Sequence, residues 1–148
     1  IKARHASQVS GLPAMADDSG LSIDALNGAP GVYSARYAGE NANDLDRINK
    51  VLSELKNVPK QKRQAQFHCA IALVQSADDE HPIVCEGIWP GLILNEPRGD
   101  KGFGYDPIFF VPEKNCSAAE LDPVLKNQMS HRGRAMEQFR ALLITEID

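Results

Sequence analysis

Two segments of alternating apolar character, joined by a short polar turn, constrain the fold more than any other part of the sequence. Gln64 to Gln75 places apolar side chains at every second position, a period that predicts a β-strand with one buried face. After the polar turn 77–82, a second apolar segment runs from Ile83 to Leu94, and we expect a bulge or bend in it near Gly87 and Pro90–Gly91. Together the two segments predict a large antiparallel hairpin.

Helices are expected on both sides of this hairpin in the sequence. Apolar residues recur at helical spacing from Asn43 to Asn57, and Asn43 with Asp46 three residues later is a helix-start signature. The first ten residues are also helical in pattern, with Gly11 just past the end. A last helix follows Arg134, with an expected buried stripe of Ala135, Met136, Phe139, Leu142 and Leu143.

Composition and charge narrow the class of protein. The 148 residues are 43% hydrophobic and 24% charged, which fits one globular domain over 1–148. A net charge of −4 gives no general attraction to nucleic acid or an anionic membrane, and no apolar run reaches the roughly 20 residues of a membrane span. Cys69, Cys85 and Cys116 lack the spacing of a disulfide framework or zinc site. We expect reduced thiols in a cytoplasmic protein.

The segment Ala16-Asp17-Asp18-Ser19-Gly20-Leu21 is a candidate cation site. Leu12–Ala16 and Leu21–Leu26 are typical of two short strands, so Asp17–Gly20 is expected to be the polar connection between them. Adjacent carboxylates repel unless one is protonated or a hard cation such as Mg²⁺ takes oxygen ligands from them. The alternative is a plain turn, because Asp, Ser and Gly are common turn residues.

Two later segments carry candidate ligand-binding residues. Phe103 and Tyr105 lie in a glycine-rich loop beside Asp106, where an aromatic face could stack on a nucleobase and the carboxylate fix its edge, or where both rings could pack in the core. Lys126 to Arg134 is a basic cluster before the last helix, where cations oppose the helix dipole. An anionic or carbonyl-rich ligand would explain them as converging donors. His68 and His81 lack metal-ligand spacing and are interpreted as structural.

Four ordered motifs resemble the inosine triphosphate pyrophosphatase family across the whole chain: Ala16–Leu21, Gly31–Tyr37, Gly102–Pro107 and Ser130–Gly133. The resemblance implies an α/β fold, with a long, mixed, twisted sheet, flanking helices and two lobes around a central cleft. It implies hydrolysis of dITP, ITP and XTP to the monophosphate and pyrophosphate, with Mg²⁺ as cofactor and a homodimer as the assembly. The implied partner is a purine nucleoside triphosphate, with no role for nucleic acid or membrane.

The resemblance also assigns roles to residues of this chain. Asp18 matches the family's catalytic carboxylate, which binds the metal and accepts a proton from water, and Asp17 is expected to assist. Ser19 matches a substrate contact, and Lys2 matches a lysine that faces the phosphates. Phe103 matches the residue that stacks on the base. The remaining matches to base contacts are Gly104, Tyr105, Asp106, Lys126, His131 and Arg132.

The chain departs from the family pattern at its start. The family begins with a strand, a phosphate loop and a helix with a second metal-binding glutamate, all of which would precede Ile1. If the protein lacks them, we expect little or no activity, and the first alternative is a nucleotide-binding module without turnover. The second alternative is a pyrophosphatase for modified pyrimidine nucleotides, which Phe103–Asp106 and His131–Arg132 disfavour.

Overall fold

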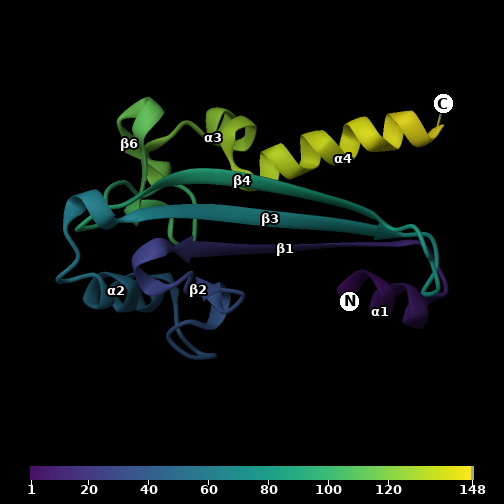
Figure 1. Cartoon of the computed structure of the whole chain (residues 1–148), viewed down its shortest axis with the longest axis horizontal. Coiled ribbons are helices and arrows are strands. Elements are labelled where there is room, and N and C mark those ends of the chain that lie inside the picture. The colour runs from purple at the N-terminus through teal and green to yellow at the C-terminus, as the bar shows by residue number, and fades with distance from the viewer. Residues whose placement is uncertain (148) are drawn as a thin grey trace.

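A six-stranded sheet forms the centre of the computed structural model, which describes residues 1–147 (Figure 1). In sheet order the strands are β2 (Pro30–Gly31), β1 (Ala14–Ile23), β3 (Gln64–Val74), β4 (Ile83–Ile93), β5 (Phe109–Val111) and β6 (Cys116–Ser117). The α/β class is confirmed. All five strand pairings within residues 1–147 are antiparallel, so the expected mixed sheet is corrected to an antiparallel one for this part of the chain.

The predicted hairpin is the longest pairing in the sheet. β3 and β4 pair without interruption from Gln64 opposite Leu92 to Leu73 opposite Ile83, so the break expected near Gly87 and Pro90–Gly91 is wrong. Gly87 serves packing instead, because a Cβ there would overlap the backbone carbonyl of His131 in the last helix. Pro90 is tolerated because β5 pairs only with Leu92 and Ile93, which leaves the rest of β4 on that side without a strand partner.

β1 corrects a second expectation. Ala14–Ile23 is one strand of ten residues rather than two short strands with a polar turn. Asp17 and Asp18 pair in register with Ile71 and Ala70 of β3. The backbone of this polar segment thus takes part in the sheet ladder, while its side chains face outward. Residues that usually favour turns are held in a strand because β3 offers a long paired edge.

Four α-helices lie on the two faces of the sheet. They are α1 (Lys2–Ser10), α2 (Asp44–Glu54), α3 (Pro123–Met129) and α4 (His131–Ile147). The capping box of Asn43 and Asp46 is present, and α1 ends at Gly11 as expected. Figure 1 shows α1 and α2 on the side of β1 opposite to α3 and α4. Short 3₁₀ turns are η1 (Asp24–Leu26), η2 (Ser34–Arg36), η3 (Lys60–Lys62), η4 (Asp106–Ile108), η5 (Pro112–Lys114) and η6 (Ala118–Glu120).

The core consists of two apolar clusters. The larger joins α2 to the sheet and to the aromatic rings of Phe67, Trp89 and Phe109. The smaller lies under α4 and contains Cys69, Ile71, Cys85, Ala135 and Phe139. Each fully buried apolar side chain of this size contributes about 1.5 to 3 kcal/mol, so these clusters hold the helices to the sheet.

The stripe predicted for the last helix is right in part. Ala135 and Phe139 are buried and Leu143 packs against them, but Met136 and Leu142 are 42% and 43% exposed. The helix packs mainly on β3 and β4, and the face that it buries is narrower than expected. Within residues 1–147, the helices are all too short or too polar to cross a membrane.

Candidate active site

The two aspartates of β1 point to opposite faces of the sheet. Successive side chains of a strand alternate between faces, and the ion pairs follow that alternation. Asp18 Oδ1 lies 3.6 Å from Lys2 Nζ of α1, whereas Asp17 Oδ2 lies 3.8 Å from an Arg132 nitrogen of α4. The two helices are on opposite sides of β1 (Figure 1). The expectation that both carboxylates serve one cation is therefore wrong for their side chains.

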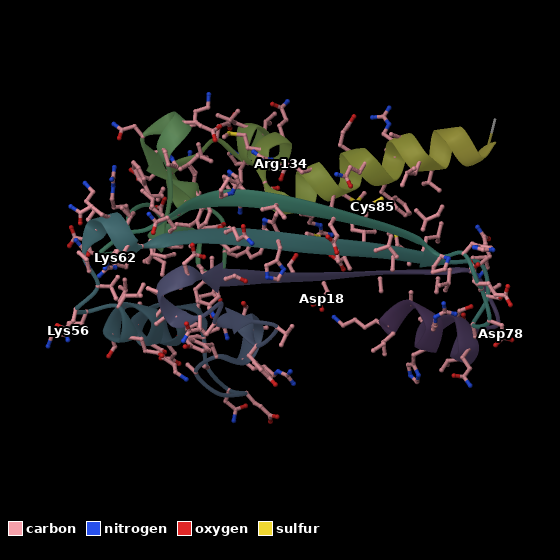
Figure 2. The ribbon with its side chains drawn as sticks, viewed as in Figure 1. Asp18, Lys56, Lys62, Asp78, Cys85 and Arg134 are labelled. Atoms are coloured by element: carbon pink, nitrogen blue, oxygen red, sulfur yellow. The ribbon has the colours of Figure 1, made fainter. Side chains whose placement is uncertain are left out.

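Asp18 is an open carboxylate. Its side chain and that of Lys2 are each 67% exposed, and Figure 2 shows Asp18 midway along β1 on the α1 side. An exposed pair of this kind contributes at most about 1 kcal/mol, so another cation can replace Lys2 at little cost. Ser19 is also exposed, but its place in the strand directs it to the face of Asp17.

Asp18 is the predicted metal ligand on this face. Across residues 1–147, no group of three or more His, Cys, Asp or Glu side chains is arranged to hold one. Mg²⁺ commonly keeps several waters and binds one or two carboxylates together with substrate phosphates. Asp18 fits that mode, in which the nucleotide itself supplies ligands.

The loop around Phe103 is built more tightly. Lys126 of α3 forms an ion pair with Asp106, and the two side chains are only 15% and 6% exposed. The same Asp106 oxygen accepts the backbone N–H of Phe103 at 3.0 Å. Gly102 has a φ of 75°, and a Cβ there would overlap the Asp106 carboxylate, so glycine is required at this turn. The sequence neighbours thus form one preorganised unit.

Phe103 and Tyr105 have different environments. Phe103 is 73% exposed, and Lys126 Nζ lies 4.5 Å from its ring centroid. The core-packing alternative is therefore wrong for Phe103. It is right for Tyr105, which is 5% exposed and donates its hydroxyl to the carbonyl of Ser34 at 2.7 Å. Burial raises the pKa of Tyr105 to about 12, so the hydroxyl keeps its proton and remains a donor.

His131 is a neutral imidazole. Its ring stacks on Phe67 with centroids 4.8 Å apart and planes 17° apart, and its buried Nδ1 has no hydrogen-bond partner among residues 1–147. Burial, with repulsion from Lys126, His68 and Arg132, lowers the pKa of His131 to about 4. The expectation of a cationic His131 is therefore corrected, because its proton is lost well below pH 7.

The basic residues before and at the start of α4 point in three directions. Lys126 pairs with Asp106, the His131 ring stacks on Phe67, and Arg132 pairs with Asp17 of β1. The structure brings Lys126 together with Phe103 and Asp106, and Arg132 together with β1. The side chains of Lys126, His131 and Arg132 therefore do not converge as one set of donors.

Two residues near the site were not found from the sequence. Asp44 at the start of α2 accepts the N–H of Gly104 at 2.9 Å, and Ser34 accepts the hydroxyl proton of Tyr105. Their partners lie 60 and 71 positions away, so no local spacing could reveal them. The only signal was the segment Gly31–Tyr37, which contains Ser34 and belongs to the resemblance without a role of its own.

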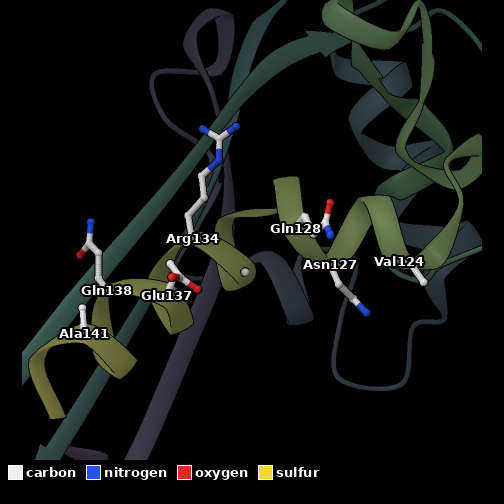
Figure 3. Close-up of a pocket in the computed structure, with 8 residues that line it drawn as sticks. Val124, Asn127, Gln128, Arg134, Glu137, Gln138 and Ala141 are labelled. Atoms are coloured by element: carbon white, nitrogen blue, oxygen red, sulfur yellow. The ribbon is translucent and has the colours of Figure 1, made fainter. Parts of the chain in front are cut away.

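A groove between α3 and α4 is separate from these residues. It has a volume of about 800 Å³ (Figure 3). Its lining residues are Val124, Asn127, Gln128, Gly133, Arg134, Glu137, Gln138 and Ala141. None of the predicted site residues is among them. The groove is wide and open, so size alone does not make it the reaction site.

Comparison with known proteins identifies the family. Residues 1–142 match the model of the Ham1 family. The chain is 60% identical over 143 residues to a dITP/XTP pyrophosphatase of Vibrio cholerae, covering 96% of this chain and 72% of that protein. It is 62% identical over 139 residues to a dITP/XTP pyrophosphatase of Idiomarina loihiensis, covering 94% of this chain and 69% of that protein.

The solved structures agree with the sequence matches. A HAM1 protein from Coxiella burnetii superposes with a TM-score of 0.95 at 57% identity, covering 98% of this chain and 74% of that chain. The Staphylococcus aureus Ham1 protein gives 0.92 at 42% identity, covering 99% and 74%. The family resemblance drawn from the four motifs is confirmed. By sequence and by fold, this chain belongs to the Ham1 family.

Proposed function

We propose that this protein hydrolyses non-standard purine nucleoside triphosphates, namely dITP, ITP and XTP, to the monophosphate and pyrophosphate. The observation that carries the proposal is the 60% identity to a relative named dITP/XTP pyrophosphatase over 96% of the chain. Such a hydrolase removes damaged purines from the nucleotide pool before they enter nucleic acid.

The Phe103 loop is the proposed base site. An exposed aromatic face provides stacking, which alone accepts any base. Selectivity comes from polar groups at the base edge: a 6-oxo purine presents an acceptor where adenine presents an amino donor. Lys126 offers only donors, so its ammonium pairs with the 6-oxo group and leaves adenine with two opposed donors. Gly104, Tyr105 and Asp106 shape this wall, and His131 with Arg132 completes the proposed base contacts.

Because His131 is neutral, it contributes to the base site differently from Lys126. A neutral imidazole has one N–H donor and one acceptor nitrogen, and its tautomer follows from the partner it meets. The unpartnered Nδ1 leaves that choice open to a ligand. His131 therefore adjusts to the base edge, whereas Lys126 sets a fixed requirement for an acceptor.

Asp18 is the proposed catalytic carboxylate. Its exposed oxygens are free to accept the proton of a water that attacks between the α- and β-phosphates. The same oxygens are the proposed protein ligands of Mg²⁺. When bound, this ion would neutralise charge on the phosphate oxygens. Lys2, beside Asp18, is proposed to face the phosphates, and Ser19 to contact the substrate. The rest of the proposal is a single domain acting as a cytoplasmic homodimer on free nucleotides.

Pyrophosphate release from dITP, XTP, dGTP, dTTP and dATP with Mg²⁺ tests this function. We expect kcat/KM for dITP and XTP to exceed that for dATP by more than about 100-fold, as a site built on donor and acceptor complementarity allows. Equal rates for dITP and dATP would contradict the base site. Preference for dTTP would favour the pyrimidine alternative, and binding without turnover would favour the binding module.

A further inference from the structure

The start of α2 lies directly against the loop that carries Phe103. Asp44 is the first residue of α2, and its Oδ2 accepts the N–H of Gly104 at 2.9 Å. Its other oxygen pairs with Arg47 at 2.5 Å, and these bonds to Arg47 and Gly104 lower the pKa of Asp44. The carboxylate is therefore charged at neutral pH, and its bond to Gly104 is a charge-assisted one.

Arg47 is itself fixed. Its side chain is 16% exposed, and its guanidinium donates to the carbonyls of Ala35 and Ala42 at 3.1 and 2.8 Å. Asp44 is thereby held in place from two sides, by the helix that contains it and by an anchored arginine. A hydrogen-bond acceptor held this firmly can restrict the backbone of Gly104, which has a φ of 60° and no side chain to pack.

Ser34 links the same loop to β1. The buried Ser34 hydroxyl accepts the N–H of Leu21 at 2.9 Å and donates to the carbonyl of Gly31 at 2.7 Å. The Ser34 carbonyl in turn accepts the Tyr105 hydroxyl. Leu21 is three residues beyond Asp18, so a short chain of hydrogen bonds runs from the strand of the proposed catalytic carboxylate to the loop of the proposed stacking ring.

We propose that Asp44 is a positioning residue for substrate, which acts by holding the Phe103 loop in its stacking geometry. This rests on the proposed function, in which Phe103 stacks on the base. Asp44 touches no substrate in this account. It works through the Gly104 amide, while the Ser34–Tyr105 bond holds the other end of the turn. In this proposal, the segment 31–47 connects β1 to the base site through its hydrogen bonds.

The test replaces Asp44 and a matched neighbour in the full protein. Asp44→Ala removes the acceptor, and Asp44→Asn keeps a neutral one. Asp46→Ala is the control, because Asp46 lies in the same first turn of α2 but its side chain bonds to the Asn43 backbone instead of the loop. We expect Asp44→Ala to raise KM for dITP about tenfold with kcat within threefold, the size of one lost charge-assisted hydrogen bond. Asp44→Asn should recover most of the loss, and Asp46→Ala should leave KM within twofold.

Two further measurements separate this role from a general loss of stability. Exchange of the Gly104 amide with solvent should become about tenfold faster in Asp44→Ala and stay unchanged in Asp46→Ala. In a Phe103→Ala background, Asp44→Ala should cause no further rise in KM, because it acts through that ring. The amide exchange measurement needs no turnover, so it tests whether Asp44 restrains the Gly104 amide even if the proposed function fails. Unchanged Gly104 exchange in Asp44→Ala, an equal KM rise in Asp46→Ala, or an additive effect with Phe103→Ala would each overturn the proposal.

Discussion

The base side and the phosphate side of the proposed site are built in opposite ways. Around Phe103, a nearly buried ion pair, a required glycine and two hydrogen bonds accepted by the Asp44 carboxylate and the Ser34 carbonyl hold one loop in place. Asp18, by contrast, makes one ion pair within the described part of the chain, and this pair with Lys2 is exposed. Within residues 1–147, the proposed base side is therefore preorganised, whereas the proposed phosphate side is open.

The largest expected effect comes from the open side. Asp18→Asn removes the proposed proton acceptor, and it should not disturb the fold because the side chain is two-thirds exposed. We expect kcat for dITP to fall about 10³-fold, as for the loss of a general base, with nucleotide binding nearly unchanged. Single-turnover pyrophosphate release and equilibrium binding of the monophosphate measure the two quantities. A rate within tenfold of the original would remove Asp18 from the mechanism.

The next effect comes from the preorganised side and is on stability. Asp106→Ala leaves the ammonium of Lys126 without its partner at a site where only 15% of its side chain is exposed. Breaking such a pair from one side costs about 3 kcal/mol of unfolding free energy. Urea unfolding measures this loss, with Asp18→Asn as the control that should change by less than about 0.5 kcal/mol. Equal stability of the two variants would erase the contrast between the two sides.

The pH dependence of the unfolding free energy tests the comparison through His131. Its folded pKa of about 4 lies below the usual histidine value of 6.5, so between these values the unfolded chain binds the extra proton. The contribution of neutral His131 to the unfolding free energy is therefore fully present above pH 6.5. As the pH falls toward 4, this contribution is lost, and the unfolding free energy decreases by an amount on the order of 3 kcal/mol. Urea unfolding from pH 7.5 to 4.5 should show this loss in the original protein and in the exposed control His5→Gln. His131→Phe, which keeps a ring against Phe67, should lose less, and an identical pH profile would contradict the assignment.

The smallest expected effect is again on the open side. Lys2→Ala removes the only ion pair that Asp18 makes within the described residues 1–147. Because both groups are exposed, the unfolding free energy should change by less than about 0.5 kcal/mol. A loss above about 2 kcal/mol would mean that this face is preorganised after all. The same urea titration that serves Asp106→Ala decides the point.

The sequence predicted those parts of the structure that depend on local spacing. The β3–β4 hairpin followed from alternation, and the start of α2 followed from Asn43 and Asp46, because both signals act over a few residues. The continuous β1 was missed because Asp17 to Gly20 resemble a turn until β3 supplies a paired edge. The opposite orientation of Asp17 and Asp18 follows from that strand.

The candidate site shows the same limit. Phe103, Asp106 and Lys126 come together as the motifs suggested, since two of them share one turn. The neutral state of His131 could not be predicted, because it depends on burial against Phe67, which is 64 positions earlier and belongs to another element. Asp44 was missed for the same reason: it is an ordinary first-turn helix residue until the Gly104 amide meets it.

The central claim is that one nucleotide spans both sides of the site, with its base on Phe103 and its phosphates at Asp18. A crystal structure of the protein with Mg²⁺ and a non-hydrolysable dITP analogue tests it most directly. The account predicts the purine ring stacked on Phe103 with its 6-oxo group within hydrogen-bond distance of Lys126, and an ion bound to Asp18 and the phosphate oxygens of the same molecule. A base seated away from Phe103, or phosphates and ion beyond reach of Asp18, would contradict it.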